Sequence, residues 1–179
     1  MLCESALMVA AAQILGMIKL WKMPWGGSVT LAMLPVVLFS IRWGAWKGMI
    51  CGLALGVLQI LMDGASAISI QSVFGDYLFA YMAVGLAGAA GDRKPAWLWG
   101  TLIGGGARFL VHFAVGATVW AMYMPESFIG LPMGNPWLYS LLYNLLYMVP
   151  NTLITVLVLW LLSSPLRRYY NGEDLKEKT

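Results

Sequence analysis

Six apolar stretches follow one another along the chain, and short loops rich in glycine, proline or charged residues separate them. The stretches are too long, and too little alternating, for the strands of a transmembrane barrel. A helical span needs roughly 20 mostly apolar residues to cross a bilayer core. We therefore expect helical spans over Ser5–Leu20, Thr30–Ile41, Gly48–Met62, Ile70–Ala90, Trp97–Met122 and Leu138–Leu162.

The balance of charged and apolar residues supports this interpretation. Of the 179 residues, 60% are hydrophobic and only 11% are charged, whereas soluble domains carry about 25% charged residues. The sequence thus predicts an all-α integral membrane bundle of six transmembrane helices over residues 1–164, followed by a polar cytoplasmic tail over residues 165–179. Such a bundle leaves no room for a soluble catalytic or nucleotide-binding domain, and nucleic acid is not an expected partner.

The lysine and arginine residues are distributed unevenly between the two sets of loops. Two of them, Lys19 and Lys22, follow the first span, and Arg108 lies inside the fifth. The remaining eight fall after the second, fourth and sixth spans: Arg42, Lys47, Arg93, Lys94, Arg167, Arg168, Lys176 and Lys178. Cytoplasmic loops carry the excess of positive charge, so both termini are expected in the cytoplasm.

The fifth span carries a stripe of unusual residues. Arg108, His112, Gly116 and Trp120 are spaced four apart, so on a helix they share one slowly drifting face. An ionisable residue inside a span indicates a functional site. His112 is the only histidine of the chain, and Gly116 is open to two interpretations, as a helix-packing residue or as space for a flat ring.

The fourth span adds a carboxylate, Asp76, in its outer half. We expect Asp76 to contact a ligand, with Arg108 orienting it from behind; a structural ion pair between the two is the alternative. Tyr139 and Asn144 of the sixth span supply the facing wall. They lie about 140° apart on an ideal helix, so one pocket holding both requires a helix end or a distortion near Tyr139. We expect Tyr143 and Tyr147 to be packing residues.

These residues predict the chemistry of a ligand. Aromatic faces attract cations, and amide and carboxylate groups hydrogen-bond to ring nitrogens and amines. The pocket therefore suits a small, flat heteroaromatic molecule captured from outside the cell. A membrane enzyme that uses His112 and Asp76 as acid and base is a weaker hypothesis, because no nucleophile, metal cluster or phosphate-binding loop accompanies the pair; neither a catalytic residue nor a metal site is expected.

Several stretches, taken in order, resemble one known family. They are A-L-M-V-A-A-A in the first span, L-P-V-V-L-F-S-I-R-W-G in the second, D-Y-L-F-A-Y-M-A-V-G-L-A-G in the fourth, R-F-L-V-H-F-A-V-G-A-T-V-W in the fifth and Y-S-L-L-Y-N in the sixth. Over almost the whole chain, the sequence resembles the thiamine-specific substrate-binding subunits (S-components) of energy-coupling-factor vitamin transporters.

The resemblance implies a multi-pass subunit of the bacterial plasma membrane without enzymatic activity or a cofactor of its own. Such a subunit captures thiamine with high affinity from the extracellular side. It docks on a transmembrane coupling subunit that carries two cytoplasmic ATPases, and it releases the vitamin inward, ATP being used by those partners. Because related S-components share the fold and differ in the pocket, the alternative cargo is another vitamin or a pyrimidine precursor of thiamine.

The resemblance also assigns residues. It implies ligand contacts by the following residues: Asp76, Tyr77, His112, Gly116, Trp120, Tyr139 and Asn144. Its small-residue pair on the first helix, which contacts the coupling subunit, matches Ala6 and Ala10. Small residues four apart let another helix approach closely, and that helix belongs either to the same bundle or to a partner protein. The chain departs from the family in having the shorter Asp76 where the family has glutamate. The outer loops after the first and third spans also align poorly, so that Trp25 is only a candidate for the thiazolium end of the pocket.

Overall fold

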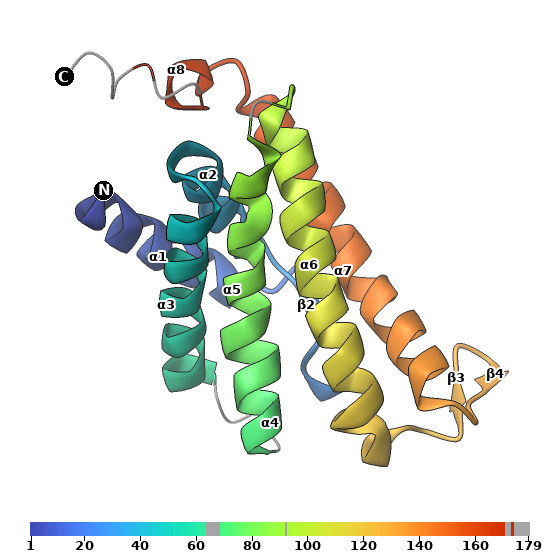
Figure 1. The fold of residues 1–179 in the computed structure, drawn as a ribbon. Coiled ribbons are helices and arrows are strands. Elements are labelled where there is room, and N and C mark those ends of the chain that lie inside the picture. Colours follow the sequence, from blue (N-terminus) through green and yellow to red (C-terminus); the bar gives the residue numbers. More distant parts are fainter. Residues whose placement is uncertain (64–68, 92, 171–172, 174–179) are drawn as a thin grey trace.

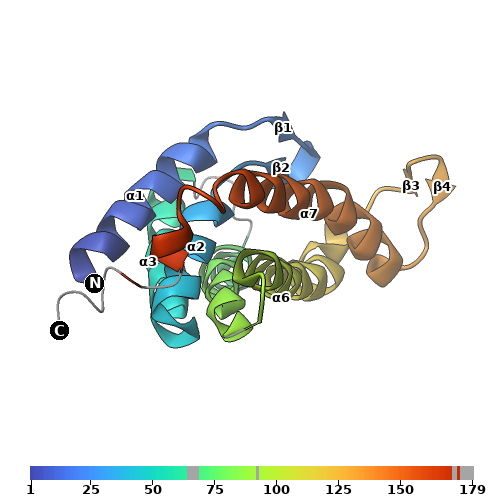
Figure 2. The ribbon, with the colours of Figure 1, turned by 90° about the horizontal axis from the view of Figure 1, so that it is seen from above.

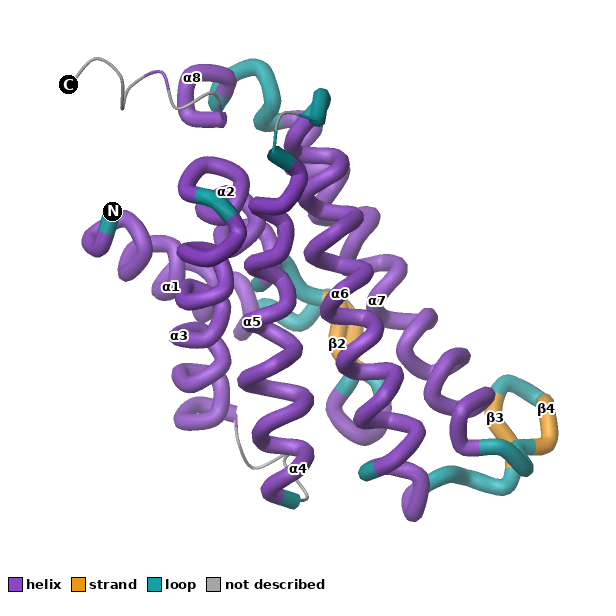
Figure 3. The backbone as a smooth tube through the Cα atoms, in the orientation of Figure 1, coloured by secondary structure: helices purple, strands orange, loops and turns teal. Residues whose placement is uncertain are grey.

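The computed structural model describes residues 1–63, 69–91, 93–170 and 173. The helices are α1 (Leu2–Met17), α2 (Met33–Trp43), α3 (Ala45–Asp63), α4 (Ile70–Ser72), α5 (Ala80–Val84), α6 (Ala96–Thr118), α7 (Pro136–Leu161) and α8 (Arg167–Tyr170). Short 3₁₀ or π segments are η1 (Pro24–Gly26), η3 (Val73–Phe79), η4 (Gly85–Ala90) and η5 (Trp120–Tyr123). In the described part of the chain, strands occur only in two short hairpins, as Figure 3 shows.

The two hairpins are antiparallel and interrupt the helical pattern at its loops. Strands β1 (Trp21–Lys22) and β2 (Ser28–Val29) pair in the connection between α1 and α2. Strands β3 (Ser127–Phe128) and β4 (Leu131–Pro132) pair between η5 and α7.

Four helical segments are long and apolar enough to cross a bilayer: Ala45–Met62, Ile70–Ala90, Ala96–Thr118 and Pro136–Leu161. Helices α1 and α2 are apolar but shorter, with 16 and 11 residues. Each of the six predicted ranges contains a helix, although the first two have shifted ends. The physical reason is the β1–β2 hairpin: the Leu20 N–H donates to the Val29 carbonyl at 2.9 Å, which folds the chain back before α2 begins.

The helices form one bundle with two distinct ends (Figure 1). The N-terminus, α8, the turn between α2 and α3 and the start of α6 lie at one end, and α4 and the β3–β4 hairpin lie at the other. Helices α6 and α7 run side by side in both views, with α1 and the β3–β4 hairpin at opposite edges of the bundle (Figure 2). The predicted positively charged loops are therefore gathered at the end that holds the N-terminus.

The interior and the outer surface of the bundle are both apolar. Met33, Phe39, Leu55 and Met148 are at most 2% exposed. Many other large apolar side chains face outward: Leu7, Leu61, Leu110, Leu153 and Trp160 are all more than half exposed. A soluble protein rarely exposes contiguous apolar surface on this scale, so the outer surface matches a lipid environment.

Part of the predicted polar tail, residues 165–179, is folded: it contains α8. The Tyr169 hydroxyl of α8 donates to Glu4 Oε1 of α1 at 2.5 Å. Arg42 of α2 lies between them: its Nε is 3.1 Å from Glu4 Oε1, and its guanidinium stacks 4.3 Å from the Tyr169 ring centroid. These contacts hold α8 against α1 and α2. Residues 171–172 and 174–179 lie outside the described part.

Candidate ligand-binding site

A cavity of about 140 Å³ lies among α6, α7, the Ile70–Ala90 run, the β1–β2 hairpin and the neighbouring ends of α1 and α3. The structure brings eight of the residues singled out from the sequence together on its wall: Asp76, Tyr77, Arg108, His112, Gly116, Trp120, Tyr139 and Asn144. That each of them contacts a ligand stays a prediction.

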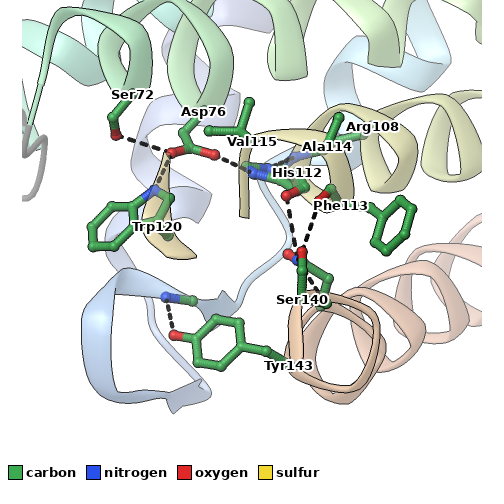
Figure 4. Close-up of polar contacts among 12 residues, drawn as sticks. Ser72, Asp76, Arg108, His112, Phe113, Ala114, Val115, Trp120, Ser140 and Tyr143 are labelled. Atoms are coloured by element: carbon green, nitrogen blue, oxygen red, sulfur yellow. Dashed lines mark hydrogen bonds and ion pairs between the residues drawn. The ribbon is translucent and has the colours of Figure 1, made fainter. Parts of the chain in front are cut away.

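Asp76 is the centre of the polar wall (Figure 4). Its Oδ2 accepts from the Ser72 hydroxyl at 2.9 Å and from the Trp120 indole N–H at 2.8 Å. Its Oδ1 lies 2.9 Å from His112 Nδ1. A carboxylate offers about four acceptor positions, and three of them are used here. The remaining one, on Oδ1, is available to an N–H or O–H group of a ligand.

The backbone around Asp76 is π-helical rather than α-helical. In η3 the Ala80 N–H donates to the Gly75 carbonyl, five residues earlier, so this turn contains one residue more than an α-turn. Single π turns are rare and often occur at functional sites. Gly75 permits the close approach of α6 at this point, since a Cβ there would lie 2.4 Å from Val115 Cγ2.

Arg108 does not pair with Asp76, so the expected support of Asp76 by a direct ion pair is wrong. Among the described residues, the hydrogen-bond partner of Arg108 is His112: its Nε–H donates to His112 Nε2 at 3.3 Å. Its guanidinium also lies 4.3 Å from the ring centroid of Tyr81 on α5. The physical reason is local, because residues four apart on a helix are neighbours.

Trp120 lies just beyond the end of α6, which is a small correction to the predicted fifth span. The α-helix ends at Thr118, and Trp120 begins η5. Its indole still turns toward Asp76, and its ring contacts Tyr123 with the ring centroids 5.9 Å apart.

Asn144 is tied to the protein by hydrogen bonds on both sides of its amide. Its Nδ2 donates to the Ser140 carbonyl at 2.8 Å and to the His112 carbonyl at 3.3 Å, and its Oδ1 accepts from the Tyr147 hydroxyl at 2.7 Å. These bonds join α7 to the pocket side of α6. Tyr139 lines the same cavity and lies in the first turn of α7. The spacing of Tyr139 and Asn144 predicts such a helix end.

Tyr143 and Tyr147 pack in the core as expected, Tyr147 within the buried cluster and Tyr143 against it, and both also line the cavity. The Tyr143 hydroxyl donates to the Pro24 carbonyl and accepts from the Gly27 N–H at 3.3 Å. Asn151, one turn beyond Tyr147, accepts from the Thr30 N–H at 2.9 Å. These contacts fasten the β1–β2 hairpin to α7 and close the cavity on that side.

Comparisons with known proteins identify the family of the chain. The family described as "Thiamine transporter protein" matches residues 2–171. The chain belongs to this family. The "Thiamine transporter ThiT" of Bacillus subtilis is 36% identical over 176 residues, covering 90% of this chain and 88% of that protein. The protein of the same description from Lacticaseibacillus paracasei is 25% identical, covering 80% and 77%.

A solved structure gives the same result for the fold. The structure of ThiT from Listeria monocytogenes superposes with a TM-score of 0.79 at 24% identity, covering 94% of this chain and 95% of that one. Members of the thiamine transporter family are transport proteins and not enzymes. With its long apolar helices, the chain is a multi-pass protein of the bacterial plasma membrane.

The other predicted residues are Trp25 and the Ala6–Ala10 pair. Trp25 belongs to η1, but its side chain lies outside what the structure describes; its neighbours Gly26 and Gly27 do line the cavity. Ala6 and Ala10 are both exposed on α1, away from the cavity. Their position is compatible with contact to another membrane protein.

Sequence reasoning missed other residues of the wall. Gln59 of α3, Lys19 after α1, Tyr81 of α5 and Ser140 of α7 all line the cavity. The signal for Gln59 is a polar residue within an apolar run, which must find a partner or a cavity. Lys19 offers no such signal, because a cation beside a span end is ordinary; only the fold brings it to the site.

Gly116 is required for the close contact of α6 and α7. A Cβ at this position would lie 2.3 Å from Ser140 Oγ and 3.2 Å from Asn144 Nδ2. We expect Gly116→Ala to destabilise the protein by about 1–3 kcal/mol through overpacking, measured as a lower midpoint of thermal unfolding in detergent. Gly106→Ala is the matched control, because nothing lies within 4 Å of a Cβ there on the same helix. Equal unfolding midpoints for the two variants would contradict this prediction.

Proposed function

We propose that the chain is a thiamine-specific S-component that captures thiamine from the extracellular side. The observation that carries the proposal is the Asp76 carboxylate, held open on one side next to the Trp120 ring, in a chain of the thiamine transporter family. The 36% identical relative from Bacillus subtilis, of which the match covers 88%, is described as a thiamine transporter. The subunit has no catalytic residue and needs no cofactor of its own.

The chemistry of the wall fits the two rings of thiamine. The aminopyrimidine is flat and carries an exocyclic amine, which suits stacking on Trp120 and donation to the open position of Asp76 Oδ1. Among the described residues, the Tyr139 hydroxyl makes no hydrogen bond to the protein and is available to a ring nitrogen. The thiazolium is a permanent cation, and Tyr77, Tyr143 and Tyr147 offer it aromatic faces.

We also propose that six helices cross the membrane with both termini in the cytoplasm. Supporting this topology, the N-terminus and α8 lie at the same end of the bundle as the turns that carry Arg42, Lys47 and Arg93 (Figure 1). Trp120 follows α6 and Tyr139 begins α7 at the opposite end. With the basic end inside, as the positive-inside rule requires, the cavity lies toward the extracellular side.

Calorimetric titration of the detergent-purified protein tests the ligand. We expect saturable, sub-micromolar binding of thiamine, and weaker binding of hydroxymethylpyrimidine because it lacks the thiazolium. Riboflavin serves as the cargo of a different class. Tight binding of riboflavin without binding of thiamine would refute the proposal. Binding of hydroxymethylpyrimidine as tight as that of thiamine would favour the alternative, a subunit for the pyrimidine precursor.

The proposal includes docking on a transmembrane coupling subunit that carries two ATPases. The exposed Ala6–Ala10 pair on α1 offers a face where a partner helix can approach closely. We expect the double variant Ala6→Trp, Ala10→Trp to bind thiamine normally and to lose uptake in cells that contain the coupling subunits. Uptake is measured with labelled thiamine in a strain lacking its own transporter.

The matched control for docking places the same bulk on another outward face. Leu153 and Leu157 lie four apart on α7 and are 62% and 52% exposed. Leu153→Trp, Leu157→Trp is expected to preserve both binding and uptake. Normal uptake by the α1 variant, or equal loss in both variants, argues against α1 as the docking helix without affecting the assignment of the ligand.

A further inference from the structure

We propose that Arg108 is a positioning residue that holds His112 as the neutral ring protonated on Nδ1. This inference deepens the proposed function, and it rests on that function only for its effect on thiamine affinity. The geometry of the three residues carries it: Arg108 Nε, the two nitrogens of His112 and Asp76 Oδ1 form one chain of hydrogen bonds with distances of 3.3 and 2.9 Å (Figure 4).

The protonation state of the ring follows by elimination. An arginine guanidinium has only donors and keeps its charge in proteins. Because the Arg108 Nε–H points at His112 Nε2, that nitrogen must be the acceptor and carries no proton. A neutral imidazole has one N–H, which must then lie on Nδ1. That N–H donates to Asp76 Oδ1 at 2.9 Å.

The surroundings of His112 favour the same arrangement. Asp76 faces it from η3, Arg108 from its own helix and Tyr147 from α7, with the Tyr147 and His112 ring centroids 6.0 Å apart. The Tyr147 hydroxyl is turned away to Asn144 Oδ1, so it does not compete for the ring nitrogens. Arg108 is 8% exposed and its guanidinium lies over the Tyr81 ring, which fixes the donor in place.

The arrangement has a consequence for recognition. Both nitrogens of His112 are engaged by the protein, so the ring can contact a ligand only through its carbon edge or its face. The hydrogen bond to the ligand is then made by Asp76, whose open Oδ1 position is an acceptor. Arg108 thus acts on the ligand through two residues, and it fixes a site that accepts an N–H donor such as the pyrimidine amine.

The test uses the single histidine of the chain. Protein labelled with ¹⁵N-histidine gives nitrogen signals from His112 alone. At pH 7 we expect a protonated Nδ1 and an unprotonated Nε2 in the wild type. In Arg108→Met the donor is lost, so we expect Nε2 to become protonated and thiamine affinity to fall about tenfold or more. Arg108→Lys keeps an N–H donor and is expected to restore the wild-type signals.

The control variant is Arg93→Met, because the Arg93 side chain is exposed and, among the described residues, bonds only to the Ala89 carbonyl. It is expected to leave the signals and the affinity unchanged. A protonated Nε2 in the wild type, or unchanged signals in Arg108→Met, overturns the proposal. If Arg108→Met does not fold, the nitrogen–nitrogen coupling across the bond between Arg108 Nε and His112 Nε2 in the wild type decides instead. Absence of thiamine binding by the wild type counts against the proposed function alone.

Discussion

Asp76→Asn is expected to weaken thiamine binding about 100-fold, the largest loss from any single isosteric change in the cavity. Three donors meet the Asp76 carboxylate, from Ser72, His112 and Trp120. An amide has one oxygen, and its NH₂ group would face at least one of these donors. Losing a charged hydrogen bond and stranding a buried donor costs about 3 kcal/mol, which corresponds to about two orders of magnitude in the dissociation constant.

Calorimetric titration with thiamine measures this loss, and Glu126→Gln is the matched control. Glu126 lies exposed in the connection between η5 and β3, and the same exchange of carboxylate for amide there is expected to leave affinity unchanged. Asp76→Glu adds a third comparison, since it keeps the charge but moves it. Wild-type affinity in Asp76→Asn would show that the Asp76 carboxylate does not bind the ligand.

Trp120→Ala is expected to lower thiamine affinity by a similar factor, about 100-fold. The change removes the stacking surface, worth about 1–3 kcal/mol for a base-like ring, together with the N–H that holds Asp76 Oδ2 at 2.8 Å. Trp120→Phe separates the two contributions, because it removes the N–H and keeps an aromatic face, although a smaller one. We expect Trp120→Phe to lose about tenfold, measured by the same titration.

Trp99→Ala controls for the loss of a tryptophan from α6 itself. Trp99 is 44% exposed and does not line the cavity. It is expected to bind thiamine as the wild type does. If Trp120→Ala also binds like the wild type, stacking on this residue is excluded and the aromatic contact must come from the tyrosines.

The helices were the most predictable part of the fold, and the hairpins the least. Apolar runs determine where helices form in lipid, because no other open structure satisfies the backbone there. The β1–β2 connection differs, since its position depends on bonds to distant residues: the Thr30 N–H to Asn151 and the Gly27 N–H to Tyr143. Nothing in the local sequence specifies such partners, which lie more than 100 residues away.

The residues that line the site were more predictable than the hydrogen bonds between them. Buried polar residues of different spans converge because each must avoid lipid, and this principle brings Asp76, His112 and Asn144 together. The predicted pairing of Arg108 with Asp76 is wrong, because the Arg108 Nε–H donates to His112, four residues along the same helix. The spacing itself contained the correct answer.

In α7, the exposed leucines on one face indicate that the tyrosines on the opposite face lie inside the bundle. Tyr139 and Tyr147 are 7% and 5% exposed, whereas Leu145 and Leu153 are 38% and 62% exposed. In a lipid-embedded helix, the leucines mark the outside and the hydroxyl-bearing residues mark the inside. A tyrosine ladder opposite a leucine face therefore predicts an interior polar surface.

The extra residue in the π turn of η3 affects the direction in which the Asp76 carboxylate points. The π turn adds one residue between Asp76 and the following segment α5, which packs against α3. Deleting a single residue within Val73–Phe79 would convert the π turn into an α-turn. It would rotate the preceding segment α4 by about 100° relative to α5. A one-residue insertion or deletion in η3 would therefore change the direction of the Asp76 carboxylate, and with it the ligand that the pocket accepts. The rest of the membrane-embedded bundle would stay the same.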